Sequence, residues 1–240
     1  MRVVLIHGSV GNARVWAPVL PLLEARHEVL TPTRGGYPPG PLLEHIDFEQ
    51  QADELAPFLG EGAHLAGHSY GAVISLLIAA RHPERVRSLV VSEPPAFALA
   101  RGNRDVDALV DGLAEHFAHG PREPRAYVEG FLLQIGSATR LPDRLPPDLE
   151  QGVRAAMVER PPWEAQIPLE ELAAADFPKL VVSGGHSKAF EAVCDVLEER
   201  LPARREVLTG AGHSIQGAPG YAELLAGFID DSGYAEPSPQ

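Results

Sequence analysis

The chain has 240 residues, of which 45% are hydrophobic and 22% charged. This composition is ordinary for a globular domain, and it argues against disordered, collagen-like and membrane-spanning proteins. Lysine and arginine number 20 against 33 aspartates and glutamates, which leaves a formal net charge of −13. Because such a surface repels polyanions, we expect neither nucleic acid nor an anionic membrane as a partner.

Cys194 is the single cysteine of the chain. One cysteine forms neither an internal disulfide nor a zinc cluster, and this usage is typical of a reducing compartment. The apolar stretch at residues 3–6 is too short for the hydrophobic part of a secretion signal. We therefore expect a cytoplasmic protein, as a monomer or a homodimer.

Short aliphatic runs alternate with helical patterns along the chain, which is typical of a parallel sheet in an α/β protein. The expected strands are residues 3–6, 28–31, 63–66, 86–91, 179–183 and 206–209. Residues 70–80 are apolar almost all round, as in a helix buried against a sheet. Helical spacing also marks residues 190–201 and 224–229, and the polar tail at 231–240 is expected to fray.

Residues 98–176 contain no convincing strand. Their periodicity is helical around residues 106–117, 126–135, 149–158 and 169–174, with proline-rich stretches between the helices. We therefore expect residues 1–97 and 177–240 to form one α/β core, with a mostly parallel central sheet and helices on both faces. Residues 98–176 are expected to form an inserted, all-helical cap.

Gly67-His68-Ser69-Tyr70-Gly71 matches the pattern G-x-S-x-G. The serine follows an apolar strand-like run and opens a long apolar helix, which is the setting of a nucleophile elbow. Because that turn is tight and strained, side chains at the two glycine positions would collide with neighbouring segments. The alternative is a serine that caps an ordinary helix.

His213 is the one histidine of ten that follows a late strand within a glycine-flanked loop, Gly210-Ala211-Gly212-His213. Parallel α/β sheets place their sites at the carboxyl ends of the strands, so His213 is the candidate general base. His68 is expected to pack or hydrogen-bond locally, and His7 to brace its loop. His186 has no assigned role.

Three motifs together resemble the α/β-hydrolase superfamily: His7-Gly8-Ser9, the pentapeptide around Ser69, and the loop that ends at His213. The likeness spans essentially the whole chain, with the cap as its variable part. It implies a serine nucleophile at Ser69 and a base at His213. It also implies an oxyanion hole formed by the backbone N–H groups of Ser9 and Tyr70.

The third catalytic residue is where the chain departs from the common pattern. Hydrolases of this kind usually carry an aspartate in a G-x-x-D turn after the penultimate strand, and here that turn reads Gly184-Gly185-His186-Ser187. Glu93 follows the strand at 86–91 and keeps the chain order nucleophile, acid, base. Some members of the superfamily take their acid from this strand, and Pro94-Pro95 would restrict the local backbone. Glu93 is therefore the expected acid. In its alternative role, this carboxylate would cap the start of the inserted helical segment.

Other carboxylates fit this role less well. Asp176 precedes its strand, so it lies at the wrong end of the sheet. Glu191 and Asp195 are close enough in sequence to compete, but Asp195 falls within the predicted helix at 190–201 and would need an unusual reach.

These roles define a mechanism of acyl transfer to serine. His213 takes the hydroxyl proton, Ser69 attacks a carbonyl carbon, backbone donors hold the oxyanion, and water hydrolyses the acyl-enzyme. An unperturbed imidazole predicts activity that rises through about pH 6 to 7. The chain has neither metal-ligand spacing nor a nucleotide-binding motif, so we expect no metal and no cofactor.

Apolar side chains of the cap could line an acyl pocket, although aromatic residues at helical spacing also serve as cap core. The candidates are Phe97, Phe117, Phe131, Leu132 and Trp163. The expected function is carboxylesterase-like hydrolysis of a small, largely apolar substrate. Carbon–carbon bond or thioester hydrolysis, acyl transfer and perhydrolysis share the same triad and stay open. A non-catalytic small-molecule receptor on this fold is the alternative from another class.

Overall fold

A computed structural model describes residues 1–233. Within them, six strands form one parallel sheet in the order β2-β1-β3-β4-β5-β6. The strands are β1 (Arg2–Ile6), β2 (Glu28–Leu30), β3 (Ala63–His68), β4 (Val86–Ser92), β5 (Lys179–Ser183) and β6 (Ala203–Val207). Every residue of the central strand β3 is buried, as expected when helices cover both faces of a parallel sheet. The α/β fold class is confirmed.

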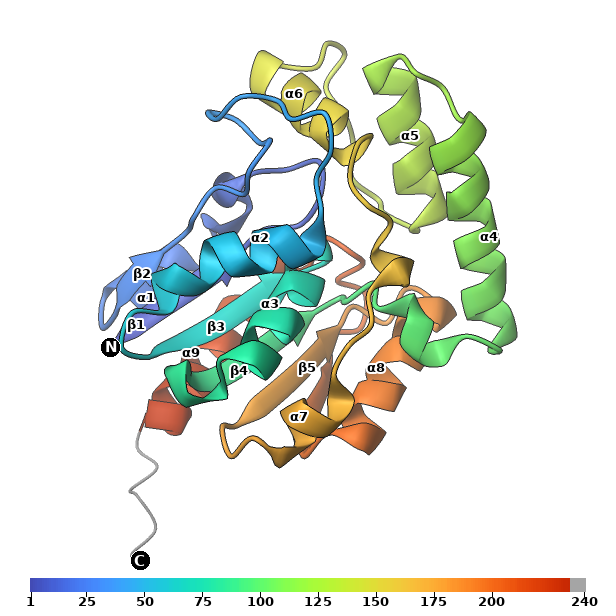
Figure 1. The fold of residues 1–240 in the computed structure, drawn as a ribbon. Coiled ribbons are helices and arrows are strands. Elements are labelled where there is room, and N and C mark those ends of the chain that lie inside the picture. The colour runs from blue at the N-terminus through green and yellow to red at the C-terminus, as the bar shows by residue number, and fades with distance from the viewer. Residues whose placement is uncertain (234–240) are drawn as a thin grey trace, which may run out of the picture.

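Helices cover the two faces of the sheet in separate groups (Figure 1). One face carries α2 (Phe48–Leu55), α3 (Tyr70–Arg81) and α8 (Lys188–Arg200), whose apolar side chains form the larger core cluster. The other face carries α1 (Leu20–Glu24) and α9 (Tyr221–Gly233) over a smaller cluster. Helix α3 begins where the central strand β3 ends, so its first turn lies at the middle of the carboxyl edge of the sheet.

Three helices lie beyond the carboxyl ends of the strands: α4 (Arg104–His119), α5 (Pro124–Gln134) and α6 (Pro147–Ala156) (Figure 1). The fourth helix expected in the cap, α7 (Leu169–Ala174), instead packs against α3 on the core, and Leu172 is fully buried there. The reason is topological. The cap lies beyond the carboxyl ends of the strands, whereas the parallel strand β5 must start at the amino-terminal edge of the sheet. The chain therefore runs back along the core before residue 176.

Sequence patterns placed some boundaries incorrectly and missed two helices. The last strand was expected at 206–209, but β6 covers Ala203–Val207, because an edge strand tolerates the charged residues Arg204, Arg205 and Glu206. Helices α1 and α2 were not predicted, although α2 buries Phe48, Gln51, Ala52 and Leu55 at helical spacing behind an Asp47 cap. Helix α9 extends to Gly233, and the rest of the tail expected to fray, 234–240, lies outside the described residues.

Candidate active site

Ser69 lies in the sharp turn between β3 and α3, with φ 54° and ψ −126°. Few non-glycine residues adopt this region, so the turn is strained. A side chain at Gly67 would collide with the carbonyl oxygen of Gly71, and one at Gly71 with that of Ile6. The Ser69 side chain makes no capping hydrogen bond to the helix. Its hydroxyl is therefore presented at the edge of the sheet rather than used as a cap.

Ser69, His213 and Glu93 form one continuous chain of hydrogen bonds. His213 Nε2 lies 3.0 Å from Ser69 Oγ, and His213 Nδ1 lies 3.1 Å from Glu93 Oε2. A carboxylate only accepts, so Nδ1 carries the proton and Nε2 presents its lone pair to the serine hydroxyl. The three residues follow β3, β6 and β4, whose carboxyl ends meet at one edge of the sheet.

Glu93 is fully buried directly after β4, where its backbone adopts φ 53°. Its Oε1 accepts a 2.6 Å hydrogen bond from the Gly184 N–H, so both carboxylate oxygens have partners. The competing acids lie elsewhere. Glu191 pairs with Arg205 at 2.5 Å, and Asp176 and Asp195 are exposed. Among these carboxylates, Glu93 is the one that contacts His213.

Two backbone N–H groups lie at the positions expected of an oxyanion hole. Ser9 follows β1, and Tyr70 is the first residue of α3. Within residues 1–233, neither N–H has a hydrogen-bond partner. The amino terminus of a helix favours negative charge, and ligands bind α/β sheets at the crevice between strands such as β1 and β3, where the strand order reverses.

Three further histidines surround these groups. His68 Nε2 donates to the His213 carbonyl oxygen at 2.7 Å, which holds the loop of the candidate base. His7 Nδ1 donates to Gly8 O at 2.8 Å, as expected for a loop brace. His186, which had no assigned role, donates from Nε2 to Ile135 O at 3.0 Å. Its buried Nδ1 lies 3.5 Å from Glu93 Oε2 and makes no hydrogen bond within residues 1–233, so His186 is placed beside the candidate acid.

Burial dominates the electrostatics of the site. It lowers the pKa of His213 to about 3, and the neighbouring His186 adds to that shift. Burial also raises the pKa of Glu93, which the Gly184 N–H and His186 partly oppose. A pKa of His213 below that of free imidazole keeps the ring neutral, the form needed in a base, to a lower pH than the sequence implied.

Two cavities meet at Ser69 and His213. The smaller, of about 30 Å³, lies beneath the cap and is bordered by Phe97, Phe117, Phe131 and Trp163, the aromatic residues expected at a pocket. The larger, of about 440 Å³, shares Ser9, Ser69 and His213 with it. It passes Leu132 and reaches the exposed residues Thr139 and Arg140. The candidate nucleophile thus lies between a small cavity and a wider groove, and the linings of both are mostly apolar.

Glu93, His186 and His213 are also the one group within residues 1–233 whose possible metal-ligand atoms lie within 4.8 Å of one another. The hydrogen bonds just described already use the ligand atoms of Glu93 and His213. Within the same part of the chain, no helix combines the length and apolar character that crossing a membrane requires.

Comparison with known proteins shows which family the chain resembles. The sequence profile of the alpha/beta hydrolase family matches residues 3–222. A pimeloyl-(acyl-carrier protein) methyl ester esterase from Aeromonas hydrophila is 29% identical, and the match covers 94% of each chain. An esterase of the same name from Neisseria meningitidis serogroup A is 27% identical over 95% of this chain and 77% of the relative.

Solved structures show the same fold. A haloalkane dehalogenase from Bradyrhizobium elkani superposes with a TM-score of 0.68 at 24% identity, covering 98% of this chain and 91% of that one. An identity this low shows the fold alone. The profile match over residues 3–222 establishes that the chain belongs to the α/β hydrolase family.

Proposed function

We propose that the chain is a serine esterase in which Ser69 is the nucleophile, His213 the general base and Glu93 the acid that orients His213. The observation that carries this proposal is the unbroken hydrogen-bond chain from Ser69 Oγ through His213 to Glu93. The esterase names of the two relatives support hydrolysis of an ester in general. Attack by Ser69 then separates a difficult hydrolysis into acylation and deacylation.

In the proposed acylation, each of these groups has one task. His213 Nε2 removes the hydroxyl proton as Ser69 Oγ bonds to the carbonyl carbon of the ester. The backbone N–H groups of Ser9 and Tyr70 stabilise the oxyanion of the tetrahedral intermediate. When that intermediate collapses, the bond to the alkoxy group breaks, and the imidazolium of His213 returns the proton to the leaving alcohol. Glu93 stabilises that imidazolium.

Deacylation repeats these steps with water. His213 removes a proton from a water molecule that attacks the carbonyl carbon of the acyl-enzyme. The same N–H donors stabilise the second tetrahedral intermediate. Its collapse breaks the bond to Ser69 Oγ, which regains its proton from His213, and the carboxylic acid is released.

The two cavities favour esters that have one small end. A volume of about 30 Å³ equals the share of roughly one water molecule in the liquid, so the smaller cavity suits a group of about one carbon atom. The groove of about 440 Å³ accepts the remainder of the substrate. Because both relatives are named methyl ester esterases, we assign the small end to the alcohol.

Covalent labelling separates the esterase from a non-catalytic receptor on the same fold. A fluorophosphonate is expected to modify wild-type protein at Ser69, as located by peptide mass spectrometry, and to leave Ser69→Ala unlabelled. Hydrolysis of p-nitrophenyl esters, measured in parallel, distinguishes ester substrates from the other bonds that such a triad cleaves. A folded wild-type protein that takes up no label would favour the receptor.

Replacing Trp163 by alanine is expected to relax selection against bulky alcohols. Its ring packs edge-on against Phe117, with centroids 5.3 Å apart, at the border of the smaller cavity. Removing it should raise kcat/KM for a butyl ester relative to the matched methyl ester by about tenfold or more. Leu133→Ala, which alters a cap side chain 81% exposed to solvent, should leave the ratio unchanged. An unchanged ratio in Trp163→Ala would contradict the assignment of the cavity.

The acid limb of the pH–activity profile is expected below the pH 6 to 7 of free imidazole. His213 acts only when neutral, so activity persists above its folded-state pKa of about 3 and falls as the pH drops through it. His186→Gln should move the midpoint of kcat/KM to higher pH, because His186 contributes to lowering the pKa of His213. Profiles from about pH 2 to 8 span the expected midpoint and measure this shift, with the exposed His119→Gln as control. A wild-type midpoint at or above pH 6 would contradict the expectation.

A further inference from the structure

Glu159 is a buried carboxylate at the active site that the proposed reaction does not use. It lies in the segment between α6 and Pro162, is only 6% exposed, and borders the smaller cavity together with Ser69 and His213. Its Oε2 accepts a 2.5 Å hydrogen bond from the Ser9 hydroxyl. The residue whose backbone N–H is a proposed oxyanion donor is thus held through its side chain.

The other oxygen of Glu159 is also fully occupied. Oε1 accepts from Arg34 Nη2 at 2.5 Å and from the Tyr37 hydroxyl at 2.7 Å. The Arg34 guanidinium is itself buried, lies over the rings of Tyr37 and Tyr70, and donates from Nε to Gln51. A buried charge requires such pairing, and with both oxygens engaged Glu159 is a fixed anchor rather than a proton carrier.

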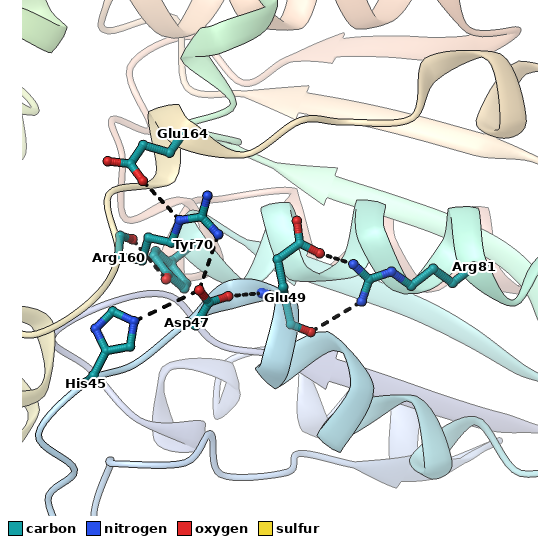
Figure 2. Close-up of polar contacts among 7 residues, drawn as sticks. All are labelled: His45, Asp47, Glu49, Tyr70, Arg81, Arg160 and Glu164. Carbon is teal, nitrogen blue, oxygen red and sulfur yellow. Dashed lines mark hydrogen bonds and ion pairs between the residues drawn. The ribbon is translucent and has the colours of Figure 1, made fainter.

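Arg160 docks the segment that carries Glu159 on the core. Its backbone N–H donates to Ile46 O at 2.7 Å. Figure 2 shows that Arg160 also contacts Tyr70 and Asp47, and Arg160 O accepts from the Tyr70 hydroxyl at 3.0 Å. The Arg160 guanidinium donates to Asp47 Oδ2 at 3.2 Å, and Asp47 caps α2. The segment is therefore attached both to the start of α2 and to Tyr70, the second proposed oxyanion donor.

The loop after β1 is also touched from α6. Val10 adopts φ 68°, and a side chain at Gly152 of α6 would collide with the Val10 carbonyl oxygen. The loop that presents the Ser9 N–H thus contains a strained residue, Val10. Two successive residues of this loop are contacted from the segment 147–164: Ser9 by Glu159 and Val10 by Gly152. A strained conformation persists only where surrounding contacts hold it, so without these contacts the direction of the Ser9 N–H would not be fixed.

We propose that Glu159 is a positioning residue for the oxyanion hole: by holding the Ser9 hydroxyl, it aims the Ser9 N–H at the developing oxyanion when the segment 158–164 is seated on the core. The inference rests on the proposed esterase function. Hydrogen-bond donors stabilise a transition state only where they meet the new charge, so loss of the tether lowers kcat more than it alters KM.

Ser9→Ala tests the tether, because it removes the hydroxyl and leaves the backbone N–H in place. We expect kcat for a p-nitrophenyl ester to fall about 10- to 100-fold, with KM changed less than about twofold. A trifluoromethyl ketone binds as a hemiketal oxyanion, so its affinity for Ser9→Ala should fall by a factor similar to the fall in kcat/KM. Ser88→Ala is the matched control: it removes another buried serine hydroxyl, bonded to His64 at 2.8 Å, and should leave kcat unchanged.

A double-mutant cycle with Glu159→Gln identifies the partner. Glu159→Gln leaves the buried charge of Arg34 without a partner and can impair folding, so the stability of each variant is first compared by thermal unfolding. If Glu159→Gln does not fold, the kinetics of Ser9→Ala alone decide whether the proposal holds. In a folded Glu159→Gln background, Ser9→Ala should cost less than about twofold in kcat, because the tether is already altered. A Ser9→Ala variant with wild-type kcat, or fully additive effects, would overturn the inference while the esterase proposal stands. A wild-type protein without hydrolytic activity would overturn both.

Discussion

Ser69→Ala is expected to lower kcat for ester hydrolysis by about 10⁶-fold, the loss seen when a serine hydrolase loses its nucleophile. The variant keeps the N–H donors of Ser9 and Tyr70, so a residual rate above that of the uncatalysed reaction should persist. Its stability should change little, because the Ser69 hydroxyl neither caps α3 nor fills a cavity in the core. Steady-state kinetics, the burst of p-nitrophenol and thermal unfolding measure these effects.

The non-additive behaviour of Ser69 and His213 provides the control. Since the two residues act as one unit, joined by a 3.0 Å hydrogen bond, His213→Ala should reduce kcat nearly as much as Ser69→Ala does. Adding His213→Ala to Ser69→Ala should then cost little more. A Ser69→Ala variant that keeps more than about 1% of wild-type kcat would show that hydrolysis proceeds without this nucleophile.

Glu93→Gln is expected to lower kcat by about 10⁴-fold, the cost of replacing this carboxylate by its amide in another serine hydrolase. An amide nitrogen facing His213 Nδ1 favours the wrong tautomer, and a neutral side chain cannot stabilise the imidazolium. The shape of the side chain is kept, and an amide oxygen still accepts from the Gly184 N–H. The change should therefore affect kcat far more than folding.

Asp195→Asn is the matched control for Glu93→Gln. Asp195 is exposed on α8, the helix that follows the turn where related hydrolases carry their acid. Its conversion to the amide should leave kcat within about twofold of wild type, as is usual for surface substitutions. If Asp195→Asn were inactive while Glu93→Gln retained activity, the acid would have been assigned to the wrong strand.

Local sequence was sufficient for the parts of the molecule that depend on neighbouring residues. The apolar run of β3, the glycines at 67 and 71 and the apolar helix α3 occupy one continuous stretch, so the strained turn at Ser69 could be predicted from it. The glycine-flanked loop of His213 could be predicted in the same way. Glu93 needed one further rule, that parallel strands bring their carboxyl ends to the same edge.

Sequence patterns gave wrong boundaries for elements whose position in the fold does not follow from the polarity of their residues. Strand β6 carries charged side chains because it lies at the edge of the sheet, and α7 has the periodicity of a cap helix although it packs on the core against α3. Periodicity reports which face of an element is apolar, and it does not report what that face packs against. The boundaries of the last strand and of the cap therefore depended on the tertiary structure.

What the sequence determined by itself is the class of fold, the turn at Ser69 and the residues able to form a triad. Only the tertiary structure placed Glu159 on Ser9 and His186 beside Glu93, and only burial moved the pKa of His213 far below that of free imidazole. Ser9 and Glu159 lie 150 positions apart, and Arg34 and Glu159 lie 125 apart. The physical reason is range: helix periodicity and turn strain are set by neighbours along the chain, whereas desolvation and pairing of buried charges depend on which distant segments fold together.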